Sequence, residues 1–546
     1  MTPSKQQYRY LAGVPRGNKK VFLSWRLLKE DDPDTPFNVE RRQGRDGNWQ
    51  RVNDQPITDS TNFLDTTPQA GSYQYRVVTP DGGVSETIEV DSGAPATLVA
   101  LSIPMNPDDE IDTMGITLGD IYNDGKMGYI IRAARAGTIW ILAFDHDGKS
   151  LWEFDTKMSH VSEWRMLHVP VLCWDINNDG RSEVVFRRDR HGRKTPQHEQ
   201  ASPDETIVAV DAQTGQIVWE CPMTGVNPRV NMTVGHLRGM DEPASLVLLD
   251  GTYGDVVLTA IAGENGKIVW QVKQARPAGH NLDIADIDGD GIQEIICGGI
   301  CYNGDGTIRW EAEPFGHTDI SKPARIDPNR EGLQIWYAVE SGNPGVYFVD
   351  NRGRTIFSEP FRHAHYGWIA RHTTEVPGLQ PHTAEDARYE YGQEEIAPKM
   401  RQLQHNPIFL PDGTHWSNLT DWQRKNFVPV HWDAGPEVVF IIRKENKRIV
   451  RFFKNGEIED LPDAKLPESG HYGRNLTCAD VMGDFRENIV ALDTDQHRLM
   501  VLLNPTLCNV RGYSPFEDFE YRHDRSQHGS GYYIYLSPPD TAVNRQ

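Results

Sequence analysis

The segment Glu264-Asn-Gly-Lys-Ile-Val-Trp270 contains the pattern that decides the fold: a turn with glycine, then a short strand that ends in an aromatic residue. Turns of this type between β-rich runs are typical of β-hairpins. Because the pattern recurs while helical periodicity is almost absent, the sequence predicts an all-β protein. Further copies of the hairpin lie at residues 145–152, 211–219, 303–310 and 350–357, with a degraded copy at 454–459.

The aromatic residues that end these hairpins lie at intervals of 67, 51, 40 and 47 residues, from Trp152 to Phe357. Periods of about 40–50 residues are typical of β-propeller blades with four strands each. We therefore expect residues 96–546 to form a seven- or eight-bladed β-propeller. A long insertion is expected at about residues 373–430, either a functional loop or a partly helical segment. The alternative, a stack of unrelated β-sandwiches, would not repeat one hairpin.

The N-terminal segment has a different pattern. Residues 21–28, 37–42 and 71–78 alternate apolar and polar side chains, as half-buried strands do. Turn residues separate these runs. We therefore expect residues 1–95 to form a small β-sandwich of the fibronectin type III kind.

The charge of the chain excludes several classes of partner. Its 546 residues include 78 acidic and 56 basic side chains, which gives a net charge of −22 with neutral histidines. Binding to nucleic acid or to an anionic membrane needs clustered Lys and Arg, so neither partner is expected. The six cysteines are too few for a disulfide scaffold. The sequence also has no apolar run long enough to span a membrane.

Acidic loops indicate bound calcium. The loop Asp286-Ile-Asp-Gly-Asp-Gly-Ile-Gln-Glu294 places oxygen ligands at alternate positions, and six or seven flexible oxygens suit Ca²⁺ better than Mg²⁺. β-Runs follow these loops, which favours structural calcium sites over EF-hands. The alternative is a plain Asp-Gly turn without an ion. The predicted ligands are Asp286, Asp288, Asp290 and Glu294; Asp175, Asn177, Asp179 and Glu183; and, in a weaker copy where Tyr122 replaces a ligand, Asp120 and Asp124.

Histidines gather in dense clusters. The run Arg362-His-Ala-His-Tyr-Gly-Trp-Ile-Ala-Arg-His372 holds three of the nineteen histidines, and Gly470-His-Tyr-Gly-Arg474 repeats its His-Tyr-Gly element. Ligands of propellers bind over the central channel, where loops of successive blades meet. Arginine pairs with carboxylates and histidine moves protons near neutral pH, so these clusters favour an anionic sugar. Alternatively, the histidines are surface or hydrogen-bonded structural groups. The sequence has no motif for a serine nucleophile, zinc hydrolysis or nucleotide binding.

Several stretches of the sequence are specific enough to compare with known families, and they occur in a characteristic order. They are Phe22-Leu-Ser-Trp-Arg-Leu-Leu28, Gly279-His-Asn-Leu-Asp283 with the acidic loop after it, Gly316-His-Thr-Asp319 and Gly483-Asp-Phe-Arg-Glu487. In these stretches the chain resembles the rhamnogalacturonan lyases of polysaccharide lyase family 11. The resemblance implies a fibronectin-like domain joined to an eight-bladed, calcium-rich propeller. It also implies β-elimination on a polysaccharide in which uronate alternates with rhamnose.

β-Elimination needs a cation beside the C6 carboxylate, a base for the C5 proton and an acid for the departing O4. We expect Arg371, or Ca²⁺ held near His317, Asp319 and Glu340, to supply the cation. His363 or His365 is the expected base, and Tyr366 or Tyr472 the expected acid. The predicted catalytic residues are His363, His365, Tyr366, Arg371, His372, His317 and Tyr472, and the predicted substrate-binding residues are Arg165, His168, Tyr253, His280, Lys322, Trp368, His471 and Arg474.

Two other functions are compatible with the sequence. A glycoside hydrolase on a similar propeller would use a carboxylate pair such as Asp319 and Glu340. A non-catalytic carbohydrate-binding propeller would account for Lys322 and Trp368, which stand where the family has histidine and arginine.

The start of the chain, Met1-Thr-Pro-Ser-Lys-Gln-Gln7, has no apolar signal core. Polymer substrates and abundant calcium are found outside the cytoplasm. We therefore expect a secreted or periplasmic monomer from which a signal was trimmed.

Overall fold

The computed structural model describes residues 8–110, 115–159, 169–192, 204–223, 230–252, 256–312, 316–385, 389–390, 394–395, 406–442, 448–466, 476–493 and 495–527. Regular structure in these residues is almost entirely β-strand, so the prediction of an all-β protein is confirmed. None of the helices found in these ranges is long and apolar enough to cross a membrane. The helical elements are α1 (Asp421–Asn426), the 3₁₀-helix η3 (Pro515–Glu517) and α2 (Phe519–Ser526).

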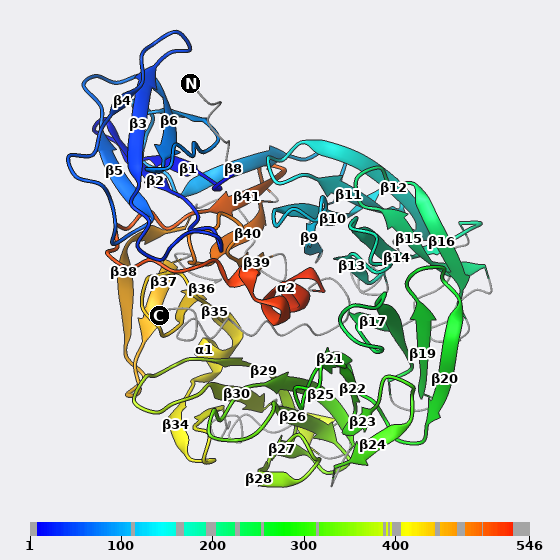
Figure 1. Ribbon diagram of the computed structural model, residues 1–546. Helices are drawn as coiled ribbons and strands as arrows, with labels where there is room; N and C mark the ends of the chain where they lie inside the picture. Colours follow the sequence, from blue (N-terminus) through cyan, green and yellow to red (C-terminus); the bar gives the residue numbers. More distant parts are fainter. Residues whose placement is uncertain are drawn as a thin grey trace.

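Eight four-stranded antiparallel sheets follow one another around a ring in the part of the chain that the structure describes (Figure 1). The first four are β9 (Ile116–Asp120), β10 (Met127–Arg135), β11 (Thr138–Phe144) and β12 (Ser150–Ser159); β13 (Val171–Trp174), β14 (Glu183–Asp189), β15 (Glu205–Asp211) and β16 (Ile217–Pro222); β17 (Val230–Gly235), β18 (Ser245–Asp250), β19 (Val256–Ala262) and β20 (Ile268–Gln274); and β21 (Asp283–Ala285), β22 (Glu294–Cys297), β23 (Ile300–Tyr302) and β24 (Ile308–Glu311).

The remaining sheets complete the ring, and the last one joins its two ends. Strand β8, which precedes all the others of the ring, pairs with β41 near the C-terminus, with Leu101 opposite Val501. Backbone hydrogen bonds therefore fasten the start of the ring to its end. These sheets are β25 (His317–Ala324), β26 (Gln334–Ser341), β27 (Gly345–Val349) and β28 (Thr355–Pro360); β29 (Ala364–Ala370), β30 (Gln380–Glu385), β33 (Pro407–Phe409) and β34 (His415–Asn418); β35 (Phe427–Val430), β36 (Val439–Ile442), β37 (Arg448–Phe452) and β38 (Ile458–Lys465); and β39 (Leu476–Ala479), β40 (Asn488–Asp493), β41 (Arg498–Leu502) and β8 (Val99–Pro104).

The hairpin repeat links each sheet to the next. Trp219 at the end of one hairpin donates its indole N–H to the carbonyl of Gly263 in the following hairpin, at 2.7 Å. Gly266 lies against the same ring: it has a φ of +70°, and a Cβ there would approach Trp219 to 2.7 Å. The turn therefore requires glycine both for its backbone angle and for the close approach. Equivalent indole bonds join Trp152 to Ala212, Trp270 to Gly304 and Trp310 to Asn351.

Two further sheets precede the ring and project from one side of it (Figure 1). They pack around a core that includes Trp25, Phe37 and Tyr75, all fully buried. The side chain of Arg26 reaches the ring and donates to the hydroxyl of Ser514 at 2.9 Å. The sheets are β1 (Ala12–Pro15), β2 (Lys20–Ser24) and β5 (Asn62–Thr66), and β4 (Gln50–Arg51), β3 (Asn38–Gln43), β6 (Ser72–Val78) and β7 (Ile88–Asp91).

The stretch at 373–430 differs from the expected single insertion. It contributes β30, β33 and β34 to the sheet that β29 begins, and α1 starts with a capping box in which Thr420 and Gln423 exchange hydrogen bonds. A two-stranded sheet of β31 (Tyr389–Glu390) and β32 (Glu394–Glu395) lies between β30 and β33 in the sequence. The turn-rich composition of this stretch concealed these short strands.

Helix α2 lies at the centre of the ring (Figure 1). Arg525 on this helix forms an ion pair with Glu487 at 2.8 Å, and both side chains are fully buried. The ring nitrogen Nε2 of His523 lies 2.6 Å from the carbonyl oxygen of Val234, and Asp524 pairs with Lys322 at 2.5 Å. The helix therefore contacts sheets from different parts of the ring.

Candidate active site

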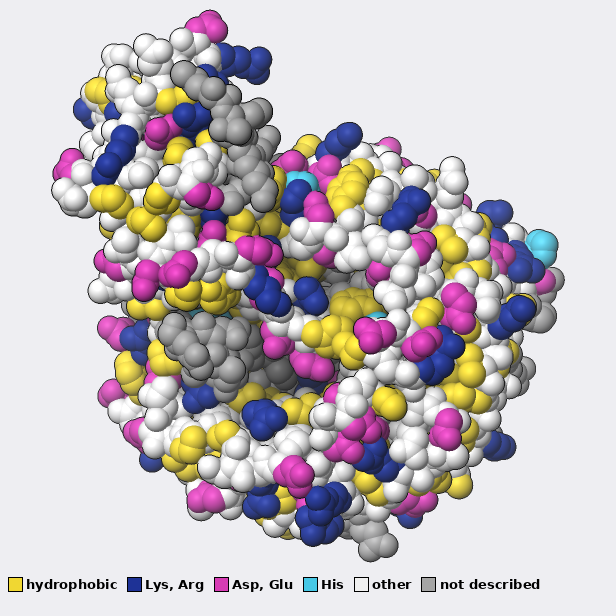
Figure 2. Space-filling view, viewed as in Figure 1, with side chains coloured by type: hydrophobic (Ala, Val, Ile, Leu, Met, Phe, Trp, Pro, Cys, Tyr) yellow, Lys and Arg dark blue, Asp and Glu magenta, His cyan; other side chains and the backbone are white. Residues whose placement is uncertain are grey.

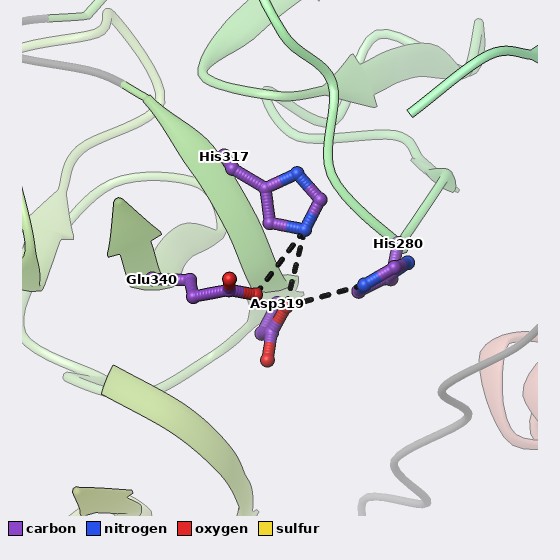
Figure 3. Close-up of side chains that lie close together, drawn as sticks. All are labelled: His280, His317, Asp319 and Glu340. Atoms are coloured by element: carbon purple, nitrogen blue, oxygen red, sulfur yellow. Dashed lines mark ion pairs between the residues drawn. The ribbon is translucent and has the colours of Figure 1, made fainter. Parts of the chain in front are cut away.

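Four side chains converge on one point near the start of β25 (Figure 3). His317 Nε2 lies 3.4 Å from a carboxylate oxygen of Glu340 and 3.5 Å from one of Asp319. His280 Nε2 lies 3.8 Å from the same Asp319 oxygen, and the two imidazole rings meet edge to face at 4.6 Å. One ligand atom from each of the four residues lies within 4.8 Å of the others.

The local sequence explains this convergence. His317 and Asp319 lie two residues apart at the start of β25, where the pairing with β26 shifts register. Glu340 lies near the end of β26, the antiparallel neighbour of β25. The loop before β21 brings in His280, whose backbone N–H donates to the carbonyl of Thr318 at 2.9 Å.

Two more histidines approach from the next sheet. His365 in β29 makes a close ion-pair contact through Nδ1 with the second oxygen of Asp319. The His363 ring lies 5.4 Å from that of His365, and both histidines share a 4.8 Å group with Glu340. Six side chains from two neighbouring sheets and the loop that leads into a third therefore form one cluster.

The two carboxyl groups of the cluster differ in proton affinity. Burial would raise the pKa of Asp319, but His365, His317 and His280 outweigh it and hold the pKa well below its usual range. Burial, followed by the negative charge of Asp319, raises the pKa of Glu340 to about 7. Asp319 is therefore ionised at neutral pH.

Exposure distinguishes the histidines of the cluster. The side chain of His317 is 1% exposed and that of His365 is 16% exposed. A general base must reach the proton that it removes. His365 can therefore meet a bound substrate, whereas His317 and His280 are enclosed and can hold other groups in place.

The structure does not bring Trp368, Arg371 and His372 to this cluster. Trp368 lies three residues along β29 from His365, and Arg371 and His372 follow the last residue of the strand. Six residue steps of extended chain place Arg371 roughly 20 Å from His365. The Trp368 indole donates to His372 Nε2 at 3.0 Å, and the His372 ring stacks on Phe440. Burial lowers the pKa of His372 to about 3, so this histidine is a neutral core residue.

Acid sensitivity follows from this core. His382 is fully buried and stacks on Trp368 at 4.1 Å, and burial lowers its pKa well below the usual value. A lowered folded-state pKa contributes stability that is complete above pH 6.5 and is lost as the pH falls below it. We expect His382→Phe to reduce the loss of unfolding free energy between pH 7 and pH 5 by about 2 kcal/mol, measured by urea denaturation at both values.

Exposed His191 provides the control, because its side chain is 62% exposed. His191→Gln should leave the pH dependence as in the natural chain. An equal pH dependence in His382→Phe and the natural chain would contradict the assignment of His382 as a buried neutral imidazole.

Lys322 has a different environment from the expected one. It lies on β25, but its ammonium group pairs with Asp283 at 3.3 Å and Asp524 at 2.5 Å. These two carboxylates outweigh burial and raise the pKa of Lys322 above its usual range. Its partner on α2 is 202 residues distant in sequence, so no local pattern could have indicated the pair.

Six of the predicted site residues lie outside the described part of the chain, and of Tyr366 only the backbone is described. The roles expected for these residues therefore stay predictions. The six are Arg165, His168, Tyr253, His471, Tyr472 and Arg474.

The acidic loops lie at the opposite end of the sheets from the cluster. They follow the first strand of a sheet, whereas His280 precedes such a strand and His317 and His365 lie near the start of theirs. Neighbouring loops also touch, since the amide of Asn123 donates to Asp175 at 3.2 Å. Any ions in these loops are therefore remote from the cluster.

The loop at 286–294 has the donor set of a hard cation. The carboxylates of Asp286, Asp288 and Asp290 offer oxygens within 4.8 Å of one another. Backbone N–H groups of Gly289 and Gly291 donate to Asp286 at 2.7 and 2.8 Å and wrap the loop around it. This arrangement fits Ca²⁺, which binds six to eight oxygen ligands.

Glu294 follows the loop as the first residue of β22. Its side chain accepts a hydrogen bond from the backbone N–H of Ile287 at 3.1 Å. In the next sheet the side chain of Gln334 accepts the equivalent hydrogen bond, from the backbone N–H of Asp327, at 2.8 Å. The hydrogen bond therefore does not need a charged side chain. Burial raises the pKa of Glu294 to about 7, and the nearby Arg309 guanidinium opposes this rise.

Arg309 is a residue of this loop's surroundings that sequence reasoning missed. Its guanidinium pairs with Glu294 at 2.7 Å and closely with Asp288. The sequence did contain a signal for Arg309. In two other hairpins the residue before the tryptophan is Val218 or Val269, whereas in this hairpin it is the charged Arg309, before Trp310. Arg309 balances part of the negative charge of the loop.

The second loop has a related geometry. Asn177 donates to Asp179 at 3.1 Å and to Glu183 at 3.0 Å, and Gly180 donates its backbone N–H to Asp175 at 3.0 Å. Burial raises the pKa of Glu183 to about 8. In the weaker loop Asp120 accepts backbone N–H groups of residues 124 and 125, while Asp124 pairs with Lys126 at 2.8 Å.

Comparison with known protein families gives matches along the chain. Residues 226–543 match the model of the C-terminal domain of rhamnogalacturonan lyase family 11. Residues 7–92 match the β-sheet domain of rhamnogalacturonan I lyases. A FAM234A/B β-propeller model also matches residues 146–298.

Two curated proteins of Bacillus subtilis (strain 168) are similar to the chain. Rhamnogalacturonan exolyase YesX is 26% identical, and the alignment covers 99% of this chain and 96% of YesX. Rhamnogalacturonan endolyase YesW is 24% identical, with 92% of this chain and 85% of YesW covered.

Solved structures show the same fold. The crystal structure of exotype rhamnogalacturonan lyase YesX superposes with a TM-score of 0.75 at 21% identity, over 98% of this chain and 96% of that one. The PL11 rhamnogalacturonan lyase of Bacillus licheniformis gives 0.74 at 22% identity, with the same coverage.

Proposed function

The chain belongs to rhamnogalacturonan lyase family 11, and from this premise we propose that it cleaves rhamnogalacturonan at the cluster of six side chains around Asp319. It is a polysaccharide lyase that acts by elimination, as its similarity over almost full length to an exolyase and an endolyase supports. The observation that carries the mechanism is the contact between buried, ionised Asp319 and partly exposed His365.

Elimination removes the C5 proton of the uronate and expels the O4 substituent. In our proposal Nε2 of His365 takes the proton, while Asp319 holds the opposite ring nitrogen and stabilises the imidazolium that forms. The electron pair of the C5–H bond becomes the C4–C5 double bond, and the C4–O4 bond breaks. Tyr366 and Tyr472 are the candidates to protonate O4.

A divalent cation fits the enclosed side of the cluster. His280, His317, Asp319 and Glu340 would hold it, because they offer two nitrogen and two oxygen ligands within 4.8 Å. Asp319 is fully buried, and one of its oxygens lies within 4.8 Å of a ligand atom from each of the other three residues, which suits a metal ligand. When bound, the ion supplies positive charge beside the C6 carboxylate and makes the C5 proton more acidic.

The same premise supports a finer description of the fold. We infer that the eight sheets are the blades of an eight-bladed propeller over residues 96–546 and that residues 1–95 are a fibronectin-like sandwich. The closure through β8 is typical of propellers, in which the first and last segments share a blade.

The setting of the enzyme follows from its substrate. We propose that the protein works outside the cytoplasm as a monomer on an acidic polysaccharide, and that neither nucleic acid nor membrane is a partner. Calcium in the loops at 286–294 and 175–183 would be structural, since these loops lie at the opposite end of the sheets from His365.

Calcium removal should destabilise the protein. Ligands that bind the folded state at a hundred times their dissociation constant stabilise it by about 2.7 kcal/mol. We expect a chelator to lower the thermal midpoint and added Ca²⁺ to restore it. In Asp286→Asn this calcium response should shrink, whereas Asp305→Asn, a turn residue of the same sheet that binds Thr307, should keep it. A midpoint independent of calcium would contradict structural ions.

The lyase proposal is tested with a panel of uronate polymers. Elimination creates a conjugated double bond that absorbs ultraviolet light, together with new reducing ends. A glycoside hydrolase gives reducing ends without absorbance, and a non-catalytic binder gives neither. We expect both signals with rhamnogalacturonan and neither with a polymer that lacks uronate.

A further inference from the structure

The N-terminal β-sheet carries an arginine-rich face that the active site does not use. In β3 and β6 alternate residues face the core, with Val39, Tyr73 and Tyr75 buried. The opposite face carries the intervening residues of these strands, and both residues of β4 are exposed. In register, Glu40 lies opposite Arg51 and Arg76, and Arg42 lies opposite Gln74.

Trp49 is the aromatic centre of this face. It immediately precedes β4 and is only half-buried. The guanidinium of Arg42 lies 4.5 Å from the centre of the Trp49 ring, and that of Arg76 lies 4.3 Å from it. Two cation–π contacts restrict the ring, so little conformational entropy is lost when a ligand packs against it.

Two of the arginines keep donors for a ligand. Within the described residues, Arg42 uses only Nε, which donates to Gln74 at 2.8 Å. Arg51 donates to the backbone carbonyls of Asn53 and Asp54, at 2.8 and 2.9 Å, and to no carboxylate. Arg76 differs, because it pairs with Glu40 at 2.6 Å. Among the described residues Arg42 and Arg51 therefore make no ion pair, although Glu40 lies opposite Arg51 and Glu89 lies opposite Gln74 on the same face.

This local charge is opposite to that of the whole chain. The strand residues on this face are Arg42, Arg51 and Arg76 against Glu40 and Glu89, a local charge of +1 (3 − 2), in a protein of net charge −22. Figure 2 shows basic and acidic side chains interspersed on the projecting N-terminal sheets, which lie on the far side of the ring from β25 in Figure 1. The net negative charge of the protein repels a polyanion. A face with local positive charge can still bind the polyanion, because the electrostatic potential there is positive.

We propose that the face formed by Arg42, Trp49 and Arg51 binds a stretch of acidic polysaccharide away from the active site. Arginine forks match carboxylates, and arginine and tryptophan are the side chains that contribute most at binding surfaces. A polymer in which charged and neutral sugars alternate needs few cations together with an apolar ring. Nucleic acid, with one charge per nucleotide, needs a denser basic surface.

The consequence for the enzyme rests on the proposed function. A polymer held at this face and at the cluster is bound at two points, so its second contact forms at a high effective concentration. Short fragments cannot span both points. The face should therefore increase kcat/KM for long chains relative to short ones.

Retention in a gel that contains rhamnogalacturonan tests the proposal. The full chain carries Asp319→Asn so that the polymer stays intact, and thermal unfolding checks the fold of each variant. We expect Trp49→Ala and Arg42→Glu each to weaken retention about tenfold, and Arg42→Lys, which keeps the charge but loses the fork, to weaken it less. The control Arg352→Ala removes an arginine that is 60% exposed and pairs with Glu331, and it should not change retention.

The outcomes separate this proposal from the lyase activity. Unchanged retention in Trp49→Ala and Arg42→Glu, with cleavage by the natural chain intact, would overturn the surface alone. If the natural chain neither cleaves nor is retained, both proposals fail. An equal loss of retention on polyphosphate would show a surface that binds anions in general and would contradict a preference for polysaccharide.

When Trp49→Ala is introduced without Asp319→Asn, the enzyme stays active. We then expect the ratio of kcat/KM on the polymer to kcat/KM on short oligosaccharides to be lower than in the natural chain. An unchanged ratio in Trp49→Ala would count against a second binding point.

Discussion

Asp319→Asn is expected to lower lyase activity by roughly three orders of magnitude, because the buried carboxylate both orients and stabilises the catalytic imidazole. The contact of Asp319 with His365 and its proximity to His317 and His280 depend on a negative charge. An amide has nearly the same shape but no charge, so the loss should appear mainly in kcat. Initial rates of ultraviolet absorbance on rhamnogalacturonan measure it.

Asp327→Asn is the matched control. This aspartate lies in the loop that joins β25 to β26, at the other end of the sheet, and pairs with Arg330. It should retain most of the activity. His365→Gln should be as inactive as Asp319→Asn, and the double variant should lose little more, since residues that act as a unit are not additive. Substantial activity in Asp319→Asn with a normal thermal midpoint would show that the reaction occurs elsewhere.

Arg525→Met is expected to destabilise the protein by about 3–5 kcal/mol, because it leaves Glu487 as an unpaired charge in the interior. Glu487 also accepts the hydroxyl of Tyr521 at 2.9 Å and the backbone N–H of His431 at 2.9 Å. These neutral donors cannot replace a guanidinium. Urea denaturation at neutral pH measures the change.

Arg522→Met gives the control on the same helix, since Arg522 is only partly buried and its change should cost little. The pair Arg525→Met with Glu487→Gln should regain part of the lost stability, because both charges are then removed. If Arg525→Met unfolds at the same urea concentration as the natural chain, α2 does not contribute to the stability of the ring.

The all-β fold could be predicted from local sequence because each hairpin contains its own turn glycine and aromatic residue. Gly266 and Trp270 mark one turn and strand, and the contact of Gly266 with Trp219 shows why glycine and an aromatic residue recur together. The short strands β30, β33 and β34 were hidden, since they lie in a stretch rich in turn residues.

The candidate site was predicted in part for a similar reason. His317, Asp319 and His365 are near the starts of strands in neighbouring sheets, so their convergence follows from the repeat. Proximity in sequence was misleading for His372, because one strand carries it from one end of the sheet to the other. The partners Lys322 and Asp524 meet across 202 residues and could only be seen in the structure.

The mass of the products of rhamnogalacturonan cleavage tests the central claim most directly. Elimination adds no water, so the masses of the two fragments of a defined oligosaccharide should sum to that of the substrate, and one fragment should carry the unsaturated uronate. Reaction in ¹⁸O-labelled water should leave both fragments unlabelled. Fragments that together gain one labelled water would show hydrolysis and contradict the account.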